Sequence, residues 1–132
     1  MVKYRFTIPL YDVRVTLVQV ESTLDYPFVE RLLRPVRVTP ELKKEIREYI
    51  EDGSANGGIT FRNMTVRTCV VVFYQMRSEL DRAEVYSHEK RHIEDRVLNW
   101  AGVDDIEASA LLAGYLGRQF AKFTALTQQN RK

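Results

Sequence analysis

The strongest constraint on the fold is an alternation of apolar and polar side chains from Val2 to Val20. This period of two is that of a β-strand with one buried face. The apolar positions are even up to Leu10 and odd from Tyr11 onward, so the phase changes just after Pro9. Because proline cannot donate to a strand ladder, we expect a bend or bulge there that splits one long strand or separates two.

The middle of the chain predicts two helices followed by two strands. A short helix is expected over residues 25–33, and a longer one begins at Thr39-Pro40 and stops at Gly53. The glycine-rich stretch 53–58 predicts a turn. Strands are expected over 59–62 and 66–75. The second of these strands is apolar on both faces, which predicts a position inside the sheet.

The last third of the chain predicts two long helices. Residues 78–100 contain neither proline nor glycine, and Gly102 is placed to end this helix as a C-terminal cap. The sequence Asp104-Asp-Ile-Glu107 resembles a capping box that opens a last helix running to about Thr127, with a frayed tail over 128–132. The inward face expected for the first of these helices comprises Leu80, Val85, His88, His92, Val97 and Trp100.

Together these elements predict an α+β fold in which a small mixed or antiparallel sheet packs on helices, as a single domain over residues 1–127. The length of 132 residues allows one hydrophobic core without support from disulfides or metal ions and leaves no room for a second full domain. The single cysteine, Cys69, lies in an apolar run and predicts a buried, inert thiol. With no apolar stretch of membrane-spanning length and no secretory signal pattern, we expect a cytoplasmic protein.

The residues that point to chemistry are His88-Glu89-Lys90-Arg91-His92, a His-Glu-x-x-His motif inside the expected long helix. Residues four apart project from the same face of a helix, so the two imidazoles can converge on one metal ion. Glu89 follows the first histidine, and its carboxylate can reach a water on that metal without being a ligand. Lys90 and Arg91 are expected to be solvated, with Glu94 and Asp95 as partners one helical turn away.

A catalytic zinc site usually has three protein ligands, and this chain has only two histidines. The third ligand must therefore be a carboxylate. Glu107 is the first choice, because a turn after Gly102 would fold the last helix back and place its start beside the middle of the long helix. Capping alone is the competing role for Glu107, and Asp104 and Asp105 are reserve ligands.

The motif and the segment Asp104-Asp-Ile-Glu-Ala-x-Ala-x-Leu-Ala-Gly-Tyr-Leu116 resemble the small zincin-type, gluzincin-like metallopeptidases of bacterial prophages and mobile elements. The resemblance implies a zincin-like fold, His88 and His92 as zinc ligands, Glu89 as general base and Glu107 as third ligand. It covers residues 86 to about 120. Fourteen residues separate His92 from Glu107, fewer than in the large gluzincins.

The leading hypothesis is a zinc-dependent metallopeptidase that hydrolyses a peptide bond with a metal-bound water and Glu89 as the base. An exposed strand edge around residues 59–62 is expected to hold the peptide or protein substrate by strand addition. Tyr86 and Tyr115 are weaker candidates for an oxyanion hydrogen bond, since tyrosines are more often core residues.

Two alternatives stay open. One is a catalytically silent zincin scaffold that binds metal and serves as an interaction module. The other is a metal-free domain whose Arg31, Arg34 and Arg37 contact nucleic acid or an acidic partner. The formal net charge of +2 does not by itself indicate a nucleic-acid partner.

Overall fold

In the computed structural model, which describes residues 1–52 and 57–129, four strands form one mixed sheet in the order β1-β2-β4-β3. The strands are β1 (Val2–Ile8), β2 (Val13–Gln19), β3 (Gly58–Asn63) and β4 (Thr68–Phe73). β1 pairs with β2 and β3 with β4 in antiparallel fashion, whereas β2 and β4 are parallel. The expected α+β class and mixed sheet are therefore confirmed.

The break at Pro9 separates two strands, as the change of phase predicted. The connection is short because Leu10 and Asp12 adopt the left-handed conformation, with φ of 68° and 53°, and the Asp12 amide donates to the Ile8 carbonyl at 3.0 Å. After this turn Val13 lies opposite Ile8 in the antiparallel register. Odd residues of β2 thereby share a face with even residues of β1.

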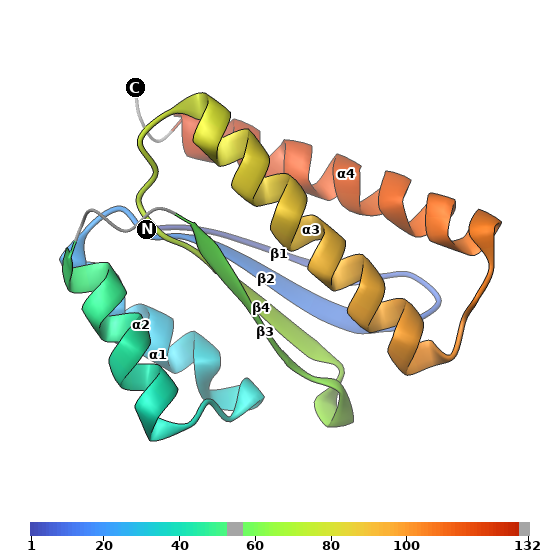
Figure 1. The fold of residues 1–132 in the computed structure, drawn as a ribbon, viewed down its shortest axis with the longest axis horizontal. Coiled ribbons are helices and arrows are strands. Elements are labelled where there is room, and N and C mark those ends of the chain that lie inside the picture. Colours follow the sequence, from blue (N-terminus) through green and yellow to red (C-terminus); the bar gives the residue numbers. More distant parts are fainter. Residues whose placement is uncertain (53–56, 130–132) are drawn as a thin grey trace.

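Four helices cover the two faces of this sheet (Figure 1). α3 (Glu79–Ala101) and α4 (Ile106–Gln129) lie on one face, and α1 (Tyr26–Leu33) and α2 (Pro40–Asp52) lie on the other. All four match expected helices, but α4 continues two residues past Thr127, so the tail predicted to fray is helical through Gln129. Part of the predicted turn, 53–56, and the last residues, 130–132, lie outside the described chain.

Each face of the sheet has its own hydrophobic core. Phe73 is the centre of the core under α3 and α4, with its ring 4.4 Å from that of Tyr86 and 5.8 Å from that of Phe123, measured between centroids. On the opposite face, Val70 and Val72 pack against the inner sides of α1 and α2. β4 serves both cores and is buried at every position, which confirms its predicted interior place.

The inward face of α3 differs from the expected one. Of the predicted residues only Val97 is buried, and Leu80 is 82% exposed. The face that packs on the sheet and on α4 comprises Arg82, Tyr86, Glu89, Ile93, Glu94 and Val97. Three of these six are charged, so the apolar periodicity of this helix is a poor guide to its orientation. Within the described residues, no helix is long and apolar enough to cross a membrane.

Candidate metal centre

The His-Glu-x-x-His motif lies in the middle of α3, whose ends are both fixed. Ser78 caps the start, where its hydroxyl accepts a hydrogen bond from the Asp81 amide at 3.1 Å. Gly102 ends the helix in the left-handed conformation with φ of 68°, as predicted. The motif is therefore held on a regular helix of 23 residues, in which positions four apart lie on one side.

The two imidazoles meet at their Nε2 atoms. These nitrogens lie 2.9 Å apart, and the ring planes cross at 83°. Two nitrogens bound to one tetrahedral zinc would be about 3.3 Å apart, given Zn–N bonds of about 2.0–2.1 Å. A small rotation of either ring separates the nitrogens enough for shared coordination. His88 is exposed and His92 is half-buried, so a dissolved ion can reach the pair.

Glu89 is buried beneath this pair, with 4% of its surface exposed. Its Oε2 accepts a hydrogen bond from the Thr60 hydroxyl on β3 at 2.5 Å. One carboxylate oxygen and one nitrogen of each histidine all lie within 4.8 Å of one another. That span can be bridged by a single water molecule, which is the arrangement that a general base needs.

The orientation of α3 places the histidines beside the free edge of β3. Successive helical residues are rotated by about 100°, so His88 and His92 project to one side of Glu89 and Lys90 projects to the other. Lys90 lines a hollow that α4 closes with Gly117 and Ala121. The histidines therefore face away from α4, toward the side of β3 that has no neighbouring strand in the described part of the chain.

Glu107 is not brought to the histidines. It is exposed in the first turn of α4 and is not part of the cluster that His88, Glu89 and His92 form. The reason is geometric, because nine residues of helix follow His92 before α3 ends, roughly 13 Å at 1.5 Å per residue. The start of α4 thus follows the end of α3 instead of lying beside its middle.

The reserve ligands are also outside the cluster. Asp104 and Asp105 are exposed in the turn between α3 and α4. Asp105 caps α4 by accepting a hydrogen bond from the Ala108 amide at 2.9 Å. Helix α4 therefore begins one residue later than the predicted capping box, which had Asp104 as its first member.

Neither tyrosine lies in the cluster. The Tyr86 hydroxyl is buried and donates to Gln19 Oε1 at 3.0 Å, and burial raises the pKa of Tyr86 well above its ordinary value. The Tyr115 hydroxyl donates to the Thr7 carbonyl at 2.9 Å. Both hydroxyls tie helices to the sheet, which is the structural role that the sequence favoured for them.

The expected partners of Lys90 and Arg91 are confirmed, because Lys90 pairs with Glu94 at 2.5 Å and Arg91 pairs with Asp95 at 3.2 Å. Arg91 is exposed as expected, but the expectation that Lys90 is solvated is wrong, because Lys90 is half-buried against the buried Glu94.

Cys69 is buried, and burial raises the pKa of its thiol to about 11. The thiol therefore stays protonated at neutral pH and is a poor nucleophile, as the apolar run around it predicted.

Two small residues of β3 complete the cluster and were not identified from the sequence. Thr60 holds the Glu89 carboxylate, and Gly58 lets the helix approach, since a Cβ on Gly58 would lie 3.3 Å from Glu89 Cγ. The two residues are two positions apart in β3, so their side chains lie on the same side of the strand. Their pairing with α3 is a tertiary contact that local patterns do not encode.

Replacing Gly58 by alanine is expected to destabilise the fold by about 1–3 kcal/mol through overpacking. The added Cβ would lie 2.9 Å from Phe73 Cδ1 and 3.2 Å from the Val72 carbonyl oxygen, and a buried ring and a backbone atom cannot yield freely. Urea denaturation would measure the loss. A stability equal to that of the parent chain would show that β3 does not approach so closely.

Comparisons of this chain with protein-family models, with curated proteins and with solved structures find no match.

Proposed function

We propose that this chain is a zinc-dependent peptidase in which His88 and His92 bind the metal and Glu89 is the general base. The observation that supports it most is the convergence of two imidazole nitrogens beside a buried, hydrogen-bonded carboxylate. Two imidazole nitrogens suit zinc as ligands, and the carboxylate beside them suits the role of base. When bound, zinc acidifies a water toward a pKa of about 7 and polarises a carbonyl.

The chain's own residues would then handle the proton. Glu89 accepts it from the water and passes it to the leaving amine nitrogen of the peptide. Thr60 positions the carboxylate by its hydrogen bond, and burial under α3 shields that contact from competing water. The Thr60 hydroxyl donates to Oε2, so Oε1 would be the oxygen that accepts from the water.

The substrate would bind along β3. Within residues 1–52 and 57–129 this strand pairs only with β4, so its outer backbone groups would be available to an extended peptide. Main-chain hydrogen bonds from strand addition would place a peptide bond on the side of α3 that carries the histidines. The edge at residues 59–62 named from the sequence lies within this strand.

The metal is expected to be exchangeable. His88 is exposed, and Glu107, the third ligand inferred from the sequence, is separate from the cluster. With two histidine ligands and water in the remaining positions, zinc must be supplied in excess to fill the site. This weak coordination distinguishes the proposal from a closed structural zinc site, which has four protein ligands.

The experiment is an assay of a mixed peptide library with mass-spectrometric detection, run with the zinc-supplemented chain and with the same chain after chelation. We expect cleavage only with zinc and its recovery when zinc is restored. Cleavage that persists in chelator, or that also occurs with the His88→Ala variant, would contradict the proposal.

A second candidate is a metal-binding domain without catalysis, acting as an interaction module. The separation of Glu107 from the histidines favours it, because catalytic zinc sites usually have three protein ligands. This candidate predicts zinc binding with no cleavage of any library peptide.

A further inference from the structure

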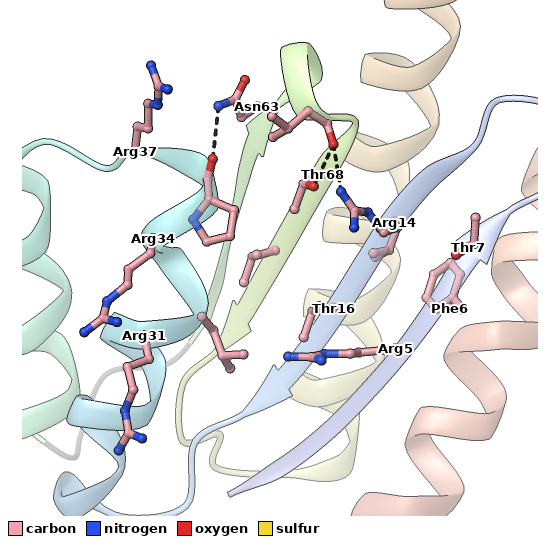
Figure 2. A pocket seen from close by; sticks show the side chains of 15 residues that line it. Arg5, Phe6, Thr7, Arg14, Thr16, Arg31, Arg34, Arg37, Asn63 and Thr68 are labelled. Atoms are coloured by element: carbon pink, nitrogen blue, oxygen red, sulfur yellow. Dashed lines mark hydrogen bonds between the residues drawn. The ribbon is translucent and has the colours of Figure 1, made fainter.

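The sheet face opposite the metal cluster has an uncovered half. Helices α1 and α2 pack on β3, β4 and the end of β2, and among the described residues their core contains no member of β1. Between α1 and the exposed faces of β1 and β2 lies a groove of about 790 Å³. Figure 2 shows Arg5 extending from β1 toward the side of the groove that carries Arg31 and Arg34.

Five arginines line this hollow, which we call the arginine groove. Arg31, Arg34 and Arg37 follow one another every three residues along α1 and the 3₁₀ turn η2 (Arg34–Val36) on one side. Arg5 and Arg14 come from β1 and β2 on the other. All five are exposed. Figure 2 shows the side chains of Arg31, Arg34 and Arg37 directed away from β1 and β2, and Arg14 donates to the Val66 carbonyl at 3.4 Å. Exposed side chains change rotamer rapidly, so these guanidinium groups can turn toward a dissolved ligand.

Hydroxyl groups alternate with the arginines on the floor. In the register of β1 and β2, Arg5 lies opposite Thr16 and Thr7 lies opposite Arg14. Thr68 continues this row on β4 opposite Arg14, but its hydroxyl donates to the Val66 carbonyl at 2.9 Å, so Thr7 and Thr16 are the hydroxyl donors of the floor. The floor therefore combines arginine guanidinium groups with neutral hydroxyl donors, two kinds of group that bind phosphate oxygens.

No acidic residue balances these charges. Neither Asp nor Glu is among the residues that line the groove, and within the described chain none of its five arginines forms an ion pair with a carboxylate. Elsewhere on the surface the arginines at 47, 67, 77 and 91 each have an acidic partner. The charge of the groove is thus concentrated on one face of a chain whose formal net charge is only +2.

We propose that the arginine groove is a binding site for a ligand that carries several phosphate groups. Two arginines on the floor and three along the α1 side favour a ligand of high negative charge, and a phosphate group contributes about 1.5 to 2 charges where a carboxylate contributes one. The volume of about 790 Å³ lies within the range of roughly 300–1,000 Å³ that is usual for ligand sites.

The groove recognises phosphate and not bases. Phe6 is the one aromatic residue in its lining, and its ring packs near Tyr115 of α4, which covers the other face of the sheet. The lining therefore offers no exposed ring for base stacking, the contact on which sequence-tolerant strand binding depends. The exposed ring of Phe28 on α1 is outside the lining and packs against the Arg31 guanidinium, whose carbon lies 5.0 Å from the ring centroid. Because this face is opposite α3, the proposal does not depend on the metal site.

Isothermal titration calorimetry with two probes tests this site. Inorganic tripolyphosphate represents a small ligand, and a twelve-residue oligothymidylate represents a nucleic-acid backbone. We expect at least one probe to bind at 50 mM salt and to bind more weakly at 200 mM. The double variant Arg5→Gln with Arg14→Gln should weaken that binding by about tenfold or more, the loss expected from one charge-assisted hydrogen bond or more.

The matched control is Arg77→Gln with Arg91→Gln, which removes the same charge from exposed positions outside the groove and should leave the affinity unchanged. If only tripolyphosphate binds, the ligand is a small molecule; if the oligothymidylate binds, its salt slope should fall by about 1.4 in the groove variant, at about 0.7 per phosphate contact. Absence of binding by both probes at 50 mM salt, or equal loss in both double variants, would overturn the proposal.

Discussion

Replacing Glu89 by glutamine is expected to lower kcat/KM for peptide cleavage by about 10²–10⁴-fold while leaving the zinc in place. General-base catalysis contributes about that factor, and an amide cannot accept the proton. The metal is retained because the two imidazoles, not Glu89, are its proposed ligands. The fold is retained because the glutamine oxygen can still accept the hydrogen bond that Thr60 donates at 2.5 Å.

Zinc content and cleavage rate should therefore be measured on the same preparation. The matched variant is Glu94→Gln, which changes another buried glutamate of α3, on the side of Lys90, and should leave cleavage within a few-fold of the parent rate. A Glu89→Gln chain that cleaves as fast as the parent would exclude Glu89 as the base. One that loses its zinc would make Glu89 a ligand instead.

Replacing Phe73 by alanine is expected to cost about 3–5 kcal/mol of unfolding free energy. The ring is fully buried and contacts those of Tyr86, Phe120 and Phe123 at centroid distances of 4.4, 6.3 and 5.8 Å. Of these three partners, Tyr86 comes from α3 and the two phenylalanines come from α4, so the cavity would loosen both helices at once. Domains have a total stability of about 5–15 kcal/mol, so the loss would be a large part of it.

The measurement is urea denaturation followed by circular dichroism, and the control is Leu80→Ala. Leu80 is 82% exposed on α3, so its truncation should change stability by no more than about 0.5 kcal/mol. A loss at Leu80 comparable to that at Phe73 would mean that α3 is rotated and that its apolar periodicity does indicate its inward face.

The strands of the sheet and the end of α3 could be predicted because their signals depend on neighbouring residues alone. These signals are the change of phase after Pro9, the two-sided apolar run around Cys69 and the cap at Gly102. The rotation of α3 could not be predicted, because Arg82, Glu89 and Glu94 are charged yet buried. Their burial depends on partners from other elements, such as the Thr127 hydroxyl that accepts from Arg82 at 3.0 Å.

The candidate site shows the same division. His88, Glu89 and His92 are brought together by the helix itself, so spacing predicted their convergence. Thr60 and Gly58 come from a strand edge, and Glu107 depends on where the next helix starts. The positions of all three residues depend on how two elements pack. This is why the expectation that Glu107 lies beside the histidines differs from the structure.

The most direct test of the account is the number of zinc ions bound per chain, measured by mass spectrometry after equilibrium dialysis against zinc, on protein made without a histidine tag. We predict about one zinc in the parent chain and in Glu107→Gln, and none in His88→Ala or His92→Ala. A parent chain that binds no zinc would contradict the account, and so would a Glu107→Gln chain that loses it as completely as His88→Ala does.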